Sequence, residues 1–187
     1  RFLANAVTYT RMGERVRAEI HAVDHFGPGD GVEGLIDVYV GSDAQLADDY
    51  PAEFRRAFGE PSPASFARAL ELGKATYIAE ACWHCHSQFV RPVSNEDLRF
   101  GPVSVASEYQ NQMNLPHLFG TRRVGPDLIR EAGKHSNDWQ MAHLYDPRSV
   151  SPYSVMPAYP WYFDADQRPT ARGLALVAYL QWLGSWP

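Results

Sequence analysis

Hydrophobic residues follow a helical spacing in two stretches of the chain. Over Phe66–Ala81 they recur every three or four positions, directly after Pro63-Ala64-Ser65, a sequence typical of a helix start. Over Thr170–Leu183 they occupy positions i, i+3, i+4 and i+7, and Gly184 stands where such helices commonly stop. The pattern therefore predicts two helices that each bury an apolar face.

The first 64 residues have a different pattern. Short apolar–polar alternations at Ala18–Ala22 and Leu35–Val40 predict strands on either side of a Gly-rich loop. Ala44–Phe58 predicts a helix that Pro51 interrupts. We therefore expect residues 1–64 to form an irregular, β-containing N-terminal extension, whose role the sequence does not indicate.

Prolines recur throughout residues 87–165 and argue against a regular sheet there. Within this region, Asn137–Leu144 has the pattern of one short helix. We expect residues 65–187 to form a single, mainly α-helical domain with long irregular connections.

Composition and charge exclude some functions. The 187 residues are 45% hydrophobic and 13% aromatic, which suffices for a packed core. The formal net charge of −5 comes from residues 1–66, and charges balance over residues 67–187, so no basic face suited to nucleic acid is present. The longest apolar stretch, near Gly173–Gly184, is too short to span a bilayer, and the N-terminus lacks the apolar segment of a secretory signal. We expect neither nucleic-acid binding nor a membrane span in this chain.

The only two cysteines, Cys82 and Cys85, lie in ACWHCHSQF, with His86 directly after them. C-x-x-C-H is the motif of covalent haem c attachment, because two thiols at this spacing reach one porphyrin and the histidine reaches its iron. A structural zinc site would usually pair this motif with a second C-x-x-C, which the chain lacks. A thioredoxin-like redox pair would follow a strand, whereas the residues before Cys82 have a helical pattern. One covalent haem c is the preferred interpretation, with zinc and a redox pair as the alternatives.

A haem that only carries electrons needs a second axial ligand opposite His86. Met156, in SVMPAYP, is the preferred candidate, because the flanking prolines hold an irregular loop that can present a thioether. Met113, in a polar segment, and Met141, in a helical stretch where methionine usually fills a core, are the alternatives, together with a vacant position. We therefore predict His86 and Met156 as the metal ligands.

Other residues are candidates for holding the haem and its histidine. The loop Thr121–Leu128 contains a Gly-Pro pair, and a carbonyl near it is suited to accept the Nδ1–H of His86 and so orient the ring. Guanidinium groups pair with carboxylates through two parallel hydrogen bonds, so three arginines are candidates for the haem propionates: Arg91, Arg122 and Arg123. Four aromatic residues are candidates for an apolar wall: Trp83, Trp139, Tyr159 and Trp161.

Several separated segments, in order, resemble the mono-haem cytochrome c subunit of cbb3-type (C-family haem–copper) cytochrome c oxidases. They are ACWHCHSQFVRP, FGPVSVASEY, LFGTRRVGPDL, HLYDPRSV and MPAYPW, and the closing ALVAYLQWLG is similar too. The resemblance covers roughly Ala69–Gly184. It implies a class I cytochrome c fold, in which the helix before the cysteines crosses the helix Thr170–Leu183 over the haem.

The same resemblance implies the roles of individual residues. Cys82 and Cys85 would form thioethers, His86 and Met156 would bind the iron, and the carbonyl of Pro126 would accept the hydrogen bond from His86. Members of the family relay electrons from a donor cytochrome toward the catalytic oxidase subunit, outside the cytoplasmic membrane. We therefore expect one-electron transfer in a respiratory chain, a chain that is not catalytic alone, and a periplasmic location.

Two departures from the family keep other functions open. Family members carry an N-terminal membrane anchor, and we expect none in this sequence. Residues 1–64 also match nothing recognisable in that subunit. The chain is then a fragment whose anchor was removed, a free periplasmic cytochrome, or a haem subunit of a different oxidoreductase. A haem enzyme with a displaceable sixth ligand and a ligand-sensing module are further alternatives.

Overall fold

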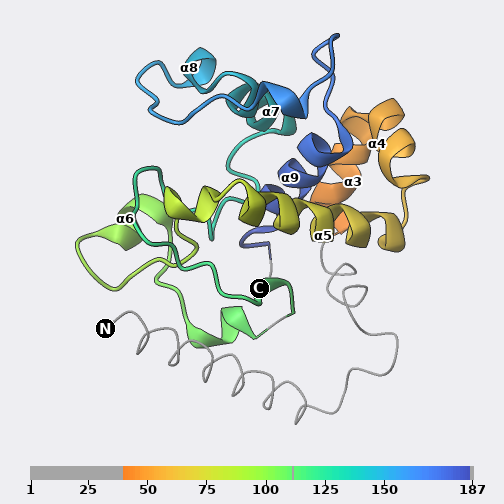
Figure 1. Cartoon of the computed structure of the whole chain (residues 1–187). Coiled ribbons are helices and arrows are strands. Elements are labelled where there is room, and N and C mark those ends of the chain that lie inside the picture. Colours follow the sequence, from red (N-terminus) through yellow and green to blue (C-terminus); the bar gives the residue numbers. More distant parts are fainter. Residues whose placement is uncertain (1–39, 111, 186–187) are drawn as a thin grey trace, which may run out of the picture.

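The computed structural model describes residues 40–110 and 112–185 (Figure 1). These residues contain seven α-helices, four short 3-10 helices and no strand, apart from an isolated bridge between Phe163 and Pro169. The α-helices are α3 (Val40–Asp49), α4 (Pro51–Phe58), α5 (Pro63–Ala79), α6 (Glu96–Phe100), α7 (Asn137–Tyr145), α8 (Pro147–Val150) and α9 (Ala171–Trp182). The 3-10 helices are Cys82–His84, Ala106–Tyr109, Gln112–Asn114 and Pro160–Tyr162. The expected mainly α-helical fold is confirmed for the described residues.

The β-structure expected in the N-terminal extension finds no support. Ala18–Ala22 lies outside the described residues, and of Leu35–Val40 only Val40 is described, where it begins α3. The described part of the extension contains α3, α4 and the first two residues of α5, and Pro51 separates α3 from α4 as predicted. The proposed boundary between residues 1–64 and 65–187 stays a prediction.

Helices α5 and α9 begin and end where local chemistry dictates. Ser62 caps α5, because its Oγ accepts from Ser65 N at 3.2 Å while its own N–H donates to Ser65 Oγ at 2.8 Å. Thr170 caps α9 with its Oγ1, which accepts from Gly173 N at 3.3 Å. Such caps satisfy N–H groups that have no partner within the helix. Gly184 follows α9 with φ +84°, a left-handed conformation that glycine adopts without strain. Both predicted helices are confirmed.

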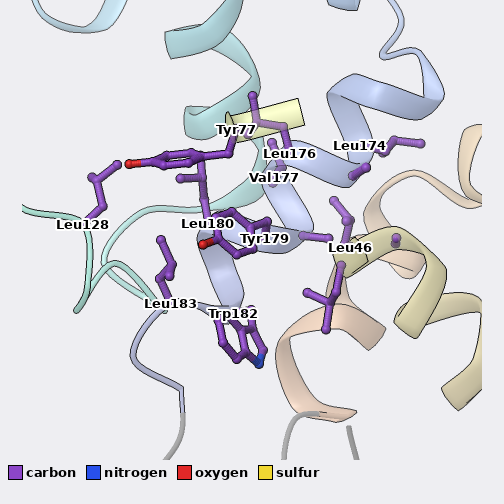
Figure 2. Close-up of a cluster of buried hydrophobic side chains, with 14 of the residues drawn as sticks. Leu46, Tyr77, Leu128, Leu174, Leu176, Val177, Tyr179, Leu180, Trp182 and Leu183 are labelled. Carbon is purple, nitrogen blue, oxygen red and sulfur yellow. The ribbon is translucent and has the colours of Figure 1, made fainter. Parts of the chain in front are cut away.

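The core forms where α5 crosses α9. Their backbones touch, since a Cβ on Gly73 would lie 2.0 Å from Ala175 O. The rings of Tyr77 and Tyr179 pack 5.4 Å apart next to this crossing (Figure 2). Every residue from Gly173 to Trp182 is buried, because other segments surround α9 on all sides. This explains why α9 carries apolar residues around its whole circumference.

Helices α3 and α4 belong to the same core. Leu46 and Phe54 are fully buried, and the Phe54 ring lies 5.1 Å from that of Phe66 in α5. Asn137 donates to Asp49 at 2.8 Å, which ties α7 to the end of α3. Among the described helices, none is long and apolar enough to cross a bilayer.

Candidate functional site

The two thiols and His86 lie on one tight turn after α5. Ala81 takes a left-handed conformation with φ +56°, which ends the helical path and starts the 3-10 helix Cys82–His84. The N–H groups of Cys85 and His86 both donate to Cys82 O, at 3.1 and 2.9 Å. Both thiols are free, Cys82 half-buried and Cys85 exposed. Burial raises the pKa of the Cys82 thiol to about 12, and the nearby Glu80 adds to the effect, so this thiol is protonated at neutral pH.

The orientation of His86 is set by the loop before Asp127. Its Nδ1 lies 2.9 Å from Pro126 O. A carbonyl oxygen can only accept, so Nδ1 carries the hydrogen and Nε2 is left with a free lone pair. Burial lowers the pKa of His86, which favours this neutral form, although the hydrogen bond to Pro126 opposes the shift. A Cβ on Gly125 would lie 2.3 Å from Cε1 of the ring, so the ring rests directly on the backbone.

Backbone hydrogen bonds hold these two segments together. Val124 N and Gly125 N both donate to Cys85 O, at 2.8 and 2.9 Å. Leu128 N donates to Ser87 O at 2.8 Å. The turn with the thiols and the loop with Pro126 therefore form one unit, although about forty residues separate them in sequence.

The three candidate arginines differ in their partners. Arg91 and Arg123 each place a terminal nitrogen 2.6 Å from Oε1 of Glu96, whereas Arg122 is exposed. All three border a hollow of about 40 Å³. Arg91 and Arg123 therefore already pair with a carboxylate of the chain itself. Contact of the three arginines with haem propionates stays a prediction.

Met156 lies in the loop between α8 and α9. It is half-buried, and its N–H donates to Ser154 Oγ at 3.2 Å. It borders a hollow of about 170 Å³ together with Asp146, Pro147, Arg148, Pro157 and Ala158. The alternative candidates Met113 and Met141 are instead almost completely buried in the core, at 4% and 5% exposure.

Tyr159 attaches the Met156 loop to α7. Its N–H donates to Leu144 O at 2.9 Å, which attaches the loop to the end of α7. Burial raises the pKa of Tyr159 to about 12, with smaller contributions from Cys82, Glu80 and Cys85. Trp161 packs edge-on at 5.3 Å against the Tyr159 ring but is 56% exposed. Tyr159 packs against the core, as Cys82 and Met156 do, and Trp161 is left exposed.

Two features go beyond the sequence-based interpretation, which named Trp139 only as a candidate for an apolar wall. The rings of His135, Trp139 and His143 stack in a column, 3.7 and 4.7 Å apart, and burial together with nearby His86 lowers the pKa of His143. Their i, i+4 spacing is the signal from which the column could have been predicted. The second feature is the buried pair of carboxylates Glu96 and Asp127, for which the sequence carries no local signal.

A family model described as "Cytochrome C oxidase, mono-heme subunit/FixO" matches residues 64–172, which is more than half of the chain. The matched segment contains both cysteines, His86, Pro126 and Met156. No curated protein matches the chain closely enough to count as a relative.

Proposed function

Because the chain belongs to the family of mono-haem subunits of cytochrome c oxidase, the FixO family, we propose that it carries one covalent haem c and transfers single electrons within an oxidase complex. The observation that carries this proposal is the turn itself. Two free thiols, three residues apart, share it with an imidazole whose Nδ1 is bonded to Pro126 and whose Nε2 has no hydrogen-bond partner among the described residues. This donor set, two sulfurs for thioethers and one nitrogen for iron, fits a haem c.

The chain's own residues would bind and orient the cofactor. Cys82 and Cys85 would form the thioethers, and His86 Nε2 and the Met156 sulfur would bind the iron. Pro126 O holds the His86 ring and makes its free nitrogen a stronger ligand. The bound haem supplies a reversible one-electron change at iron, and methionine ligation raises its potential relative to two histidines.

The remaining candidates act on the surroundings of the haem. Tyr159 supplies an apolar wall beside the thiols, and Trp161 extends that wall to the rim. Arg122 is exposed and suited to a propionate, while Arg91 and Arg123 would have to share their charge between a propionate and Glu96. Helices α5 and α9 correspond to the crossing terminal helices of a class I cytochrome c domain, spanning residues 65–187.

The partners follow from the family and from haem chemistry. We propose a donor cytochrome on one side and the haem–copper subunit of an oxidase on the other, with the chain itself not catalytic. Attachment of haem c takes place outside the cytoplasm, which favours the periplasm or the outer face of the membrane.

Mass spectrometry of the chain, produced with haem c maturation and then denatured, tests the proposal. We expect the added mass of one haem, and loss of that mass in the Cys82→Ala/Cys85→Ala double variant. A parent chain without covalent haem would overturn the proposal.

Met156→Ala tests the ligand assignment. It should keep the haem, lower its reduction potential and let the ferrous iron bind carbon monoxide. Met141→Leu is the control, since it changes a buried methionine in α7, and it should keep the parent spectrum. If Met156→Ala also keeps the parent spectrum and potential, another group fills the sixth position.

A further inference from the structure

A single buried carboxylate lies directly behind the His86–Pro126 hydrogen bond. Asp127 is 1% exposed and accepts four hydrogen bonds. Its Oδ2 receives Ser87 Oγ at 2.5 Å, Phe89 N at 2.8 Å and Arg123 Nη2 at 3.2 Å, and its Oδ1 receives Ile129 N at 2.9 Å. Donors surround both oxygens, and this arrangement suits the ionised carboxylate and not the protonated acid.

The position of Asp127 in the chain gives these contacts their meaning. Asp127 directly follows Pro126, and Ser87 directly follows His86. The carboxylate therefore joins the segment that carries the imidazole to the segment that carries its acceptor carbonyl. Any shift of Asp127 changes the distance between Nδ1 and Pro126 O, which is now 2.9 Å.

Arg123 is the positive partner of this carboxylate. Its side chain is 12% exposed, its Nε donates to Ser87 Oγ at 2.6 Å, and its Nη1 pairs with Glu96 at 2.6 Å. The ring of Phe100 covers the guanidinium at 4.7 Å and keeps water away. A negative and a positive charge thus lie buried together, and both are bonded to Ser87, the residue that follows His86. Charges in such surroundings act more strongly than at the surface.

We propose that Asp127 and Arg123 are positioning residues for the axial histidine, and that their opposite charges set the reduction potential of the haem. This inference depends on the proposed function, because it requires His86 to bind a haem iron. A buried negative charge stabilises the ferric state over the ferrous state, and a buried positive charge has the reverse effect. The two residues therefore act on the potential with opposite signs, although they lie in one network.

Redox titration of the haem-loaded full chain tests the signs. Asp127→Asn should move the ferric–ferrous equilibrium about tenfold toward the ferrous state, which is about 59 mV for one electron. Arg123→Gln should move it in the opposite direction. Arg123→Lys keeps the charge without the planar fork, so its potential should stay near that of the parent. Glu108→Gln is the charge-matched control, because Glu108 pairs with Arg130 instead of Arg123, and its shift should stay below about twofold.

A purely structural role makes a different prediction. Both variants would then loosen the site, admit water and move the potential in the same direction. Shifts of the same sign for Asp127→Asn and Arg123→Gln, or an Arg123→Lys shift as large as that of Arg123→Gln, would overturn the inference. If Asp127→Asn does not attach haem, the two Arg123 variants still test the inference. A reduction potential that falls in Arg123→Gln and stays at the parent value in Arg123→Lys is expected only if the charge of residue 123 acts on the haem. A parent chain without covalent haem refutes the proposed function instead.

Discussion

The imidazole of His86 rests on the backbone of Gly125, so closely that a Cβ at residue 125 would lie 2.3 Å from Cε1 of the ring and 2.8 Å from Nδ1. Space, and not backbone conformation, requires glycine here, since Gly125 has no positive φ. The same contact holds the ring with its Nδ1 toward Pro126 O. A side chain at residue 125 is therefore incompatible with the observed position of His86.

The first prediction concerns Gly125→Ala. The added methyl group should push the ring away from the loop and break or lengthen the hydrogen bond to Pro126. We expect the haem to stay attached, because both thiols are untouched, and the iron to become partly high-spin, because its histidine is displaced. Visible and magnetic circular dichroism spectra of the ferric protein measure this change.

Gly133→Ala is the matched control for that variant. Gly133 has φ +70°, but no atom lies within 4 Å of a Cβ built there. The substitution should lower the free energy of unfolding by about 1 kcal/mol through backbone strain and leave the spectrum unchanged. If Gly125→Ala keeps a fully low-spin spectrum, the ring has more freedom than the contact implies.

Local features of the sequence predicted the turn with the thiols and the helices on which it depends. Cys82, Cys85 and His86 are close in sequence, so their spacing alone places them on one turn. Ser62 and Thr170 cap their helices through bonds to residues three positions later. The break at Pro51 is local in the same sense. Such features need no knowledge of the tertiary structure.

Contacts between distant segments could not be predicted in this way. The sequence alone suggests that Arg123 is available to bind a propionate. In the fold it forms ion pairs with Glu96 and Asp127, and only the tertiary structure brings Glu96 close to it. Nothing local indicates that Leu46 and Phe54, in the N-terminal extension, are fully buried. The sequence-based interpretation treated the extension as separate because it lacked a motif, whereas burial depends on which segments meet.

The second prediction concerns the helix crossing. Gly73→Ala should lower the free energy of unfolding by about 3 kcal/mol, because the methyl group would overlap Ala175 O and the two backbones must separate. Glu71→Ala changes an exposed residue of the same helix and should have an effect below about 0.5 kcal/mol. Denaturant unfolding followed by circular dichroism compares the two. Equal denaturant midpoints for Gly73→Ala and Glu71→Ala would mean that the helix crossing accommodates the methyl group without a loss of stability.

The third prediction concerns acid stability. Burial alone would raise the pKa of Glu96, but hydrogen bonds from Arg123 and Arg91 outweigh it and hold the pKa at about 2 instead of 4.5. The folded carboxylate therefore binds its proton later than the unfolded one as the pH falls. Its stabilising contribution, at most about 3 kcal/mol, should be complete above pH 4.5 and disappear between pH 4.5 and 2.

Glu96→Gln and Asp97→Asn separate this effect from general acid unfolding. Both remove one carboxylate from α6, but Asp97 is exposed. The free energy of unfolding of Glu96→Gln should depend less on pH below 4.5 than that of the parent, whereas Asp97→Asn should follow the parent. Parallel curves for all three proteins would contradict the assignment.

The last prediction concerns a lysine inside the core. Lys74 is 7% exposed, and its Nζ donates to Met113 O at 2.6 Å and to Leu115 O. Burial lowers its pKa from 10.5 to about 8. Between these values the unfolded chain holds a proton that the folded chain has lost, so this group should increase the free energy of unfolding as the pH rises from 8 to 10.5. The gain is about 3 kcal/mol at most.

Lys74→Met should remove this gain and leave two carbonyl groups without their donor. Lys134→Met is the control, because Lys134 also donates to a carbonyl, that of Phe100 at 3.3 Å, but is exposed. Burial raises the pKa of several tyrosines above their ordinary value of 10.0, so the unfolded chain loses these protons first and the fold weakens as the pH rises. Each variant is therefore compared with the parent at the same pH. The stability difference between parent and Lys74→Met should widen from pH 8 to 10.5, and that for Lys134→Met should stay constant. A constant difference for Lys74→Met would mean that the two carbonyl acceptors keep the ammonium charged throughout.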